Sequence, residues 1–354
     1  MHRKTRFVCV SDTHGYTPSE AGFRLPVGDV LIHAGDLTNQ GSKPELRKTM
    51  DWIAAADFEA KIVICGNHDI TLDTPFYKLH GPRFHNKQPQ SPSECIDIVT
   101  KASPSIVFLQ HQSALVRLRR PNGPNTVFKV FGSPYSQCEG PWAFLYESNE
   151  AESLWSQIPL DADVVVTHMP PRLHCDRVSG VSMGCLGLKR RLQMVRPCLA
   201  VCGHIHESRG FERVRWAPVS KEAEGEGENA EDQMVKGVLP PQGSKKQSLV
   251  DMTGKRAPKL DNDGFSGAKA SFPSPDSQDV VLLPPHNPKE DHGFSDSDTL
   301  SEAQNTDTLG LQAQRRETCV VNAAVMASNW PHRGGRKFYP GPIVVDLELP
   351  VWTE

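Results

Sequence analysis

Short apolar runs recur along the chain, and five of them are followed at once by residue types that bind metals. Runs of this length are typical of buried strands. They cover residues 7–10, 30–32, 62–65, 164–166 and 199–202. The polar blocks after them are Asp12-Thr13-His14, Gly35-Asp36, Gly66-Asn67-His68-Asp69, Thr167-His168 and Gly203-His204-Ile205-His206. In open α/β sheets ligands bind at the carboxyl ends of the strands, so the five blocks predict one shared site.

Helices are predicted between the strands. The sequence Ser42-Lys43-Pro44-Glu45 is typical of a capping box, and apolar residues follow it at helical spacing. Further helices are expected near residues 94–101, from about 147 to before Pro159, and over 185–195. The last should stop before Pro197, because the residue before a proline avoids α geometry.

The stretch between residues 73 and 105 is rich in proline and polar residues, and apart from the helix near its end it is expected to be irregular. Three short apolar segments follow it, and we expect them to be strands of a second sheet. They cover residues 107–109, 114–118 and 126–130.

The composition changes near Ala217. From there to about residue 317 the chain is dominated by Glu, Gly, Ser, Asp, Lys, Pro and Gln. Apolar residues are too sparse to offset the entropy of ordering, so residues 217–317 are predicted to be a low-complexity, disordered insert. Strand-like patterns return after it, so the insert should interrupt one domain made of residues 1–216 and 318–354. A hairpin loop between strands near 210–216 and 318–325 is its natural place, because long loop insertions cost little closure entropy.

Charge and cysteine content narrow the class of protein. The 39 basic and 42 acidic residues give a net charge of −3, which offers no electrostatic basis for binding a nucleic-acid duplex or a membrane surface. The nine cysteines are scattered, without a CxxC pair, which argues against a disulfide framework and favours a reducing compartment. The apolar run behind the basic N-terminus is too short for a signal peptide. We therefore expect a cytoplasmic protein.

The donor set of the five blocks points to divalent metal ions. Aspartate, histidine and asparagine suit a borderline or hard ion such as Mn, Fe or Zn. Seven candidate ligands exceed what one ion needs, so a two-metal centre is the simpler account, with Asp36 as the bridging carboxylate. Two ions about 3.5–4 Å apart can clamp a phosphoryl group and generate a hydroxide nucleophile near neutral pH.

The order of these five motifs resembles the calcineurin-like metallophosphoesterase superfamily. Other segments resemble its metallophosphoesterase-domain-containing subgroup. They are Ser11-Asp12-Thr13-His14-Gly15, Gly132-Ser133-Pro134, Thr167-His168-Met169-Pro170-Pro171, Cys202-Gly203-His204-Ile205-His206-Glu207 and Val321-Asn322-Ala323-Ala324. The resemblance implies a four-layer α/β/β/α sandwich with two mixed sheets, and a hydrolase that cleaves phosphoesters.

The resemblance also implies a role for each residue. Asp12, His14 and His206 would hold the first metal ion. Asn67, His168 and His204 would hold the second, and Asp36 would bridge the two. His68 would face the substrate and protonate the leaving oxygen or stabilise the phosphoryl charge, with Asp69 orienting it.

The subgroup resemblance favours a phosphodiesterase that acts on a small or cyclic nucleotide-like phosphodiester through a metal-bridging hydroxide. Two alternatives stay open. One is a serine/threonine protein phosphatase. The other is a nucleotide-binding scaffold with little turnover, whose protein partner would engage residues 217–317.

Other polar and aromatic residues have ordinary structural interpretations. His33 lies within a strand and is expected to be a packed, hydrogen-bonded core residue. His174 is expected to be a solvated loop residue, although a substrate contact is open. Asn322 fits either a turn or a hydrogen bond to a ligand loop. Trp142 and Phe144 fit either the mouth of the site or the core.

Overall fold

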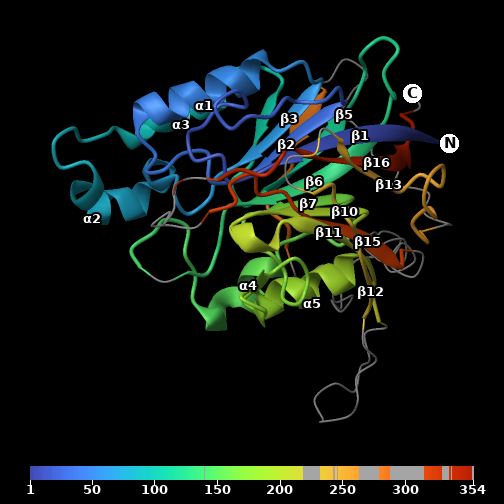
Figure 1. Ribbon diagram of the computed structural model, residues 1–354. Helices are drawn as coiled ribbons and strands as arrows, with labels where there is room; N and C mark the ends of the chain where they lie inside the picture. Colours follow the sequence, from blue (N-terminus) through green and yellow to red (C-terminus); the bar gives the residue numbers. More distant parts are fainter. Residues whose placement is uncertain are drawn as a thin grey trace, which may run out of the picture.

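The chain forms two mixed sheets that face each other and are covered by helices on their outer sides (Figure 1). The computed structural model describes residues 1–138, 140–217, 232–241, 244, 246–262, 279–287, 315–328, 335 and 337–352. The helices are α1 (Lys43–Ala55), α2 (Thr74–Phe84), α3 (Pro92–Thr100), α4 (Ala151–Trp155) and α5 (Leu186–Val195). Short 3-10 turns occur at η1 (Ile70–Leu72), η2 (Ser148–Glu150) and η3 (His206–Ser208).

The first sheet has the strand order β13-β16-β1-β2-β3-β4. Its members are β1 (His2–Val10), β2 (Val30–Ala34), β3 (Ala60–Ile64), β4 (Ile106–Phe108), β13 (Ser248–Asp251) and β16 (Ile343–Pro350). Strands β1 to β4 run parallel, so the loops after β1, β2 and β3 leave from the same edge. These are the loops that carry the first three polar blocks.

The second sheet has the order β12-β11-β15-β10-β7-β6-β5-β14. Its members are β5 (Gln112–Arg117), β6 (Val127–Ser133), β7 (Val164–Thr167), β10 (Leu199–Cys202), β11 (Gly210–Arg215), β12 (Gln233–Lys236), β14 (Val280–Leu282) and β15 (Glu317–Asn322). The pair β8 (Arg177–Val178) and β9 (Val181–Ser182) forms a separate ribbon. Strands β7 and β10 are parallel neighbours, so the last two polar blocks also share an edge.

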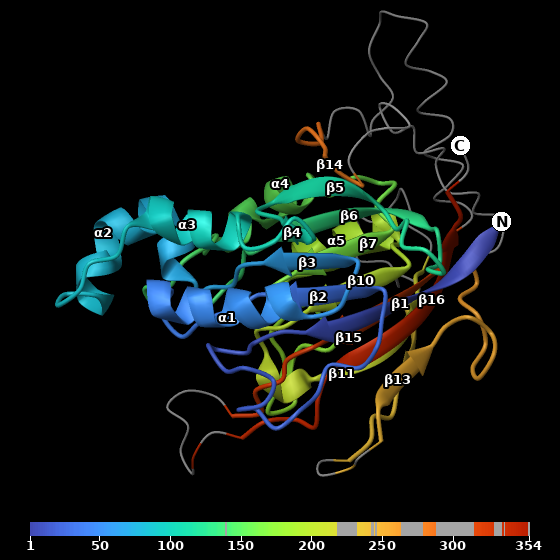
Figure 2. The same cartoon turned by 90° about the horizontal axis from the view of Figure 1, so that it is seen from above.

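Three apolar clusters hold the four layers together. One lies between the sheets and includes Phe7, Val166 and Val345. A second packs the outer face of the first sheet against the helices above it. In Figure 2 α1 lies along β2, and α3 lies on the side of β4. A third packs α4 and α5 against the second sheet. The implied four-layer α/β/β/α sandwich is confirmed.

The sheets are also joined directly at the edge where the polar blocks lie. Ser11, just after β1, makes a parallel bridge with Ala324, just after β15. The Nδ1 atom of His168, in the loop after β7, lies 2.9 Å from the carbonyl oxygen of Ala34 in β2. Hydrogen bonds of this kind fix the two rims relative to each other, and the five blocks therefore meet at one place.

All four predicted helices are present as α1, α3, α4 and α5, and α2 is an addition. The Ser42 N–H donates to the Glu45 carboxylate at 3.1 Å, as the capping box requires. The sequence prediction was wrong for α2, because residues 74–84 are helical rather than irregular. Asp73 caps this helix by accepting from the Phe76 N–H at 3.0 Å, and proline occupies its first turn. An aspartate followed two residues later by proline was the signal that could have revealed it.

Strand β4 corrects a second expectation. We predicted residues 107–109 in the second sheet, but β4 pairs in parallel with β3 at the edge of the first. Only β5 and β6 of the three predicted strands belong to the second sheet. The apolar pattern of a three-residue strand reports burial but not the partner, so the sequence could not decide between the sheets.

The predicted insert contains strands that complete both sheets. The hairpin β11–β15 that brackets it is antiparallel, as expected. Within it, β12 pairs with β11, β13 with β16 and β14 with β5. These stretches differ from the expected disorder because their backbones pair with strands of the sheets, and Val250, Met252 and Leu260 are buried in the cluster between the sheets. Residues 218–231, 242–243, 245, 263–278 and 288–314 of the predicted insert lie outside the described residues. The domain limits 1–216 and 318–354 stay a prediction.

Among the residues that the structure describes, none of the helices combines the length and apolar character needed to cross a membrane.

A pair of leucines tests whether residues 217–317 contribute to the core. Leu260 is 5% exposed and belongs to the cluster between the sheets, whereas Leu282 is 58% exposed. We expect Leu260→Ala to lower the free energy of unfolding by about 2–4 kcal/mol. Leu282→Ala should change it by less than about 0.5 kcal/mol. Urea unfolding of both variants measures this, and equal stabilities would show that the segment adds nothing to the core.

Candidate metal centre

Four of the candidate ligands adopt a backbone conformation that side chains with a Cβ rarely accept. The φ angles are 57° at Asp12, 45° at His14, 51° at Asp36 and 64° at His204. Non-glycine residues in this left-handed region cost about 1–3 kcal/mol each and cluster at functional sites. The chain accepts this strain here because each loop must turn its side chain back over the strand ends.

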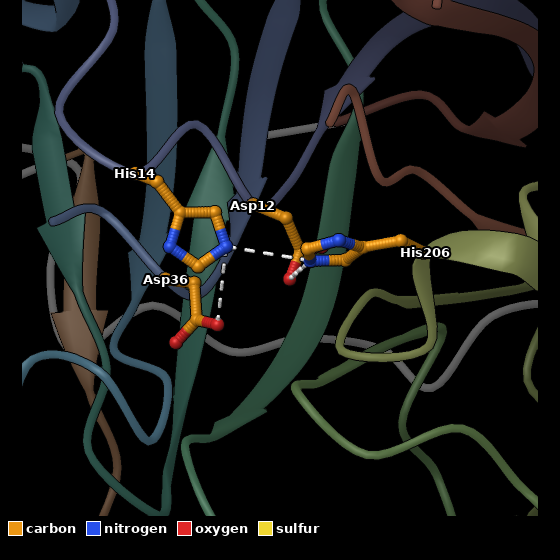
Figure 3. Close-up of side chains that lie close together, drawn as sticks. All are labelled: Asp12, His14, Asp36 and His206. Carbon is orange, nitrogen blue, oxygen red and sulfur yellow. Dashed lines mark hydrogen bonds and ion pairs between the residues drawn. The ribbon is translucent and has the colours of Figure 1, made fainter. Parts of the chain in front are cut away.

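Asp12, His14, Asp36 and His206 form the tightest cluster of ligand atoms (Figure 3). One ligand atom from each residue lies within 4.8 Å of all the others, and all four residues are buried. The Nε2 atoms of His14 and His206 are 3.3 Å apart. His206 Nε2 lies 3.3 Å from Asp12 Oδ1, and His14 Nε2 lies 3.7 Å from Asp36 Oδ2.

Asn67, His168 and His204 lie on the other side of Asp36. His168 Nε2 is 3.1 Å from Asn67 Oδ1 and 3.4 Å from Asp36 Oδ1. The rings of His168 and His204 have centroids 5.0 Å apart. Asp36 is therefore the residue that both groups share, with one carboxylate oxygen turned toward each. The structure brings all seven predicted ligands together.

The hydrogen bonds behind the histidines direct their Nε2 atoms into the cluster. Since the partner of His168 Nδ1 is the Ala34 carbonyl oxygen, Nδ1 must donate. His206 Nδ1 faces the carbonyl oxygen of Ser328 at 3.2 Å in the same way. In a neutral ring the lone pair then sits on Nε2, opposite carboxylate and amide oxygens. Several acceptors facing one another fit a bound cation.

The charges within the cluster follow from burial and from mutual attraction. Burial disfavours the ionised form of Asp12, but the hydrogen bond from His206 prevails and lowers its pKa to about 2. Burial lowers the pKa of His14 to about 3 and that of His204 to about 4. Burial also opposes the charged form of His168, but the Asp36 carboxylate outweighs it and raises this pKa to about 9. His14 and His204 are thus neutral near pH 7, whereas His168 is protonated. A bound cation would displace the His168 proton, because metal ions bind the neutral imidazole and the ionised carboxylate.

Two glycines make room for the carboxylates. A Cβ at Gly66 would lie 2.3 Å from Asp36 Oδ1, and one at Gly203 would lie 2.3 Å from Asp12 Oδ2. Both distances are far below van der Waals contact, so the ligand loops can approach only where the side chain is a hydrogen.

His68 stands at the edge of the cluster, held by contacts on three sides. Its Nδ1 lies 2.8 Å from the Asn39 carbonyl oxygen, and its backbone N–H donates to Asp36 Oδ1 at 3.0 Å. Its ring is 4.7 Å from that of His14 and 4.1 Å from that of Trp142, centroid to centroid. Trp142 is half-buried here, while Phe144 belongs to the core.

Asp69 was expected to orient His68, but its carboxylate makes its hydrogen bonds elsewhere. Its carboxylate accepts from the backbone N–H groups of Leu37, Thr38 and Gly66, at 2.8–3.1 Å, and from the Thr38 hydroxyl at 2.7 Å. These donors come from the loops after β2 and β3. Asp69 therefore ties together the loops that carry Asp36 and Asn67, and the Asn39 carbonyl orients His68 instead. A residue that acts through its backbone oxygen leaves no sequence signal.

Asn322 clamps the last ligand loop. Its side-chain Nδ2 donates to the carbonyl oxygens of Ile205 at 2.9 Å and Cys175 at 3.1 Å. It holds the turn between His204 and His206, which decides between the two interpretations of this residue. His33 is a core residue, as predicted, with its Nε2 2.9 Å from the Thr13 hydroxyl.

His174 differs from the expected solvated loop residue. It is 3% exposed, with Nδ1 3.3 Å from Glu212 Oε2. Asp232, which pairs with Lys189 at 2.8 Å, lies 3.9 Å from its other ring nitrogen. These partners come from distant parts of the sequence, so the local pattern could not reveal them.

Comparisons with known proteins agree with this geometry. The chain is 40% identical over 213 residues to the "Probable rhamnogalacturonate lyase C" of Emericella nidulans, covering 60% of this chain and 18% of that protein. It is 35% identical over 217 residues to "Metallophosphoesterase domain-containing protein 1" of Homo sapiens and of Mus musculus, covering 58% of this chain and 62% of each of those proteins. The chain thus spans less than two thirds of the length of these relatives.

The similarity to the human and mouse proteins supports the subgroup resemblance. Residues 5–208, more than half of the chain, match the description "Calcineurin-like phosphoesterase", and they carry all five polar blocks. The chain belongs to the calcineurin-like phosphoesterase family.

Proposed function

We propose that this protein is a metal-dependent phosphoester hydrolase with two divalent ions, and that it acts on a small or cyclic nucleotide-like phosphodiester. The observation that carries the proposal is the shared position of Asp36. It lies between Asp12, His14 and His206 on one side and Asn67, His168 and His204 on the other. A pair of divalent ions would supply Lewis-acid binding of phosphoryl oxygens and activation of the attacking water. Mn, Fe and Zn all suit this donor set.

The protein's own contribution beyond the ligands centres on His68. With Nδ1 engaged by the Asn39 carbonyl, Nε2 is the atom that exchanges a proton with the leaving oxygen. The face of Trp142 and the edge of His14 restrict the ring to one orientation. A positioned acid of this kind lowers the barrier because the proton donor needs no reorganisation when the ester bond breaks.

Turnover by metal-reconstituted protein tests the function. We expect hydrolysis of a bis-aryl phosphate and of cyclic nucleotides that depends on added metal and is abolished by a chelator. Hydrolysis of a phosphoserine or phosphothreonine protein, with none of diesters, would favour a protein phosphatase. Metal binding without turnover of any phosphoester would contradict the enzymatic proposal and favour a nucleotide-binding scaffold, with residues 217–317 as the contact for a protein partner.

Asp36→Ala tests the bridging carboxylate. Elemental analysis of the reconstituted wild-type protein should approach two metal ions per chain. Asp36→Ala should lose both ions, because each depends on this carboxylate, whereas Asp57→Ala, at a side chain 88% exposed, should keep them. Full metal content in the Asp36 variant would show that this residue does not bridge.

His68→Ala tests the division between metal ligand and proton donor. It should keep both ions and lose about 10²–10⁴-fold in kcat. The loss should shrink for esters with good leaving groups, which need no proton. His2→Ala, at the exposed start of β1 and so at the opposite end of that strand from Asp12, is a control that should leave kcat unchanged. A His68 variant that loses metal would overturn the assignment.

A further inference from the structure

A cavity of about 300 Å³ opens directly beside His14, at the start of α1. Its walls are mostly apolar and come from the loops after β1 and β2 and from the first two turns of α1. The residues that define its character are Tyr16, Glu45 and Lys48. A volume of this size accepts a ring-bearing group of a small molecule.

The cavity shares two residues with the proposed catalytic site. His14 lines it and is a proposed metal ligand, and Asn39 lines it and holds His68. The Asn39 side chain also donates to the His14 carbonyl oxygen at 2.7 Å, which fixes the wall between cavity and site. A group bound here would therefore sit next to a phosphorus atom held by the proposed ions.

Tyr16 gives the cavity a flat wall of fixed orientation. The edge of Phe338 supports its ring, with centroids 5.0 Å apart and an angle of 61° between the planes. Lys48 Nζ lies 5.9 Å from the same ring centroid. Planar rings pack against such a surface more favourably than saturated groups of the same area.

The charged groups of the cavity are largely committed to other partners. Glu45 accepts from the backbone N–H groups of Asn39 at 3.0 Å and Ser42 at 3.1 Å. Lys48 pairs with Glu20 at 2.8 Å, with both side chains over 40% exposed. The ammonium has three donors and can still bind an acceptor atom on a guest. These contacts favour an uncharged planar ring over a strongly charged group.

We propose that this cavity binds the second ester group of the phosphodiester substrate and selects an aromatic ring, with Tyr16 as its stacking surface and Lys48 as a donor to an acceptor on the ring. This inference rests on the proposed hydrolase function and names the substrate class that the same site would prefer. A saturated ring of equal size would fill the space but could not stack.

Two substrates with one leaving group test the stacking. They are phenyl 4-nitrophenyl phosphate and cyclohexyl 4-nitrophenyl phosphate, assayed with metal-loaded full-length protein. The ratio of their kcat/KM values should fall about three- to tenfold in Tyr16→Leu relative to wild type. Comparison between variants cancels the intrinsic difference in reactivity of the two esters. Tyr16→Phe keeps the ring and should keep the wild-type ratio.

Lys48 is tested with a ring that carries an acceptor. Lys48→Met should raise KM for 4-acetylphenyl 4-nitrophenyl phosphate about threefold or more while leaving KM for the phenyl ester within twofold. Lys43→Met is the matched control, since Lys43 lies on the same helix and pairs with Glu94 outside the cavity. An equal effect of both variants would remove Lys48 from the proposal.

The results of these experiments distinguish a failure of the proposed subsite from a failure of the proposed hydrolase function. An unchanged phenyl-to-cyclohexyl ratio in Tyr16→Leu, in a variant that still binds two ions, overturns the subsite while leaving hydrolysis intact. If Tyr16→Leu loses its metal, Phe338→Leu, which removes the support of the ring, should lower the ratio instead. Absence of turnover by the wild type contradicts the proposed function. Calorimetry with phenylphosphonate and cyclohexylphosphonate then tests the same ratio as affinities, and equal affinities overturn the subsite.

Discussion

The Asp36 carboxylate joins the two halves of this molecule at the point where its sheets meet. It follows β2 of the first sheet and lies 3.4 Å from His168, which follows β7 of the second. On its other side it faces His14, and a backbone N–H donates to it from the loop after β3. A buried carboxylate with lost partners costs several kcal/mol, so the loops around it must keep their positions together.

Hydrogen bonds between the surrounding loops offset the backbone strain of this arrangement. Left-handed backbone at Asp12, His14, Asp36 and His204 is maintained because the loops are tied to one another rather than left to relax. Asp69 binds the loops after β2 and β3, and Asn322 binds the turn that carries His204 and His206. Neither side chain belongs to the proposed ligand set, yet both set where the ligands lie. Catalytic geometry in this fold therefore depends on buried hydrogen bonds one layer behind the ligands.

The parts of the fold that could be predicted from the sequence are those that depend on a few neighbouring residues. A buried strand followed by a ligand residue is a pattern of a few residues, and it located all seven side chains that the structure brings together. The capping box at Ser42 located α1 for the same reason. Helix α2 was not predicted, because Pro82 lies inside it and few of its apolar residues form a continuous buried face. The Asp73 cap was its main sequence signal.

The features that could not be predicted depend on contacts between distant segments. The partner sheet of β4, the burial of His174 beside Glu212, and the strands within residues 217–317 are all decided by tertiary packing. Asp69 looked like a partner of His68 because it is adjacent in the chain, but its carboxylate turns toward the loop after β2. Sequence adjacency places a residue near a site without saying which way its side chain points.

The central claim is that Asp36 stands between two metal positions, and anomalous scattering from crystals grown with Mn²⁺ tests it most directly. We predict two anomalous peaks that flank the Asp36 carboxylate, one among Asp12, His14 and His206 and the other among Asn67, His168 and His204. A single peak, or two peaks that do not share Asp36, would contradict it.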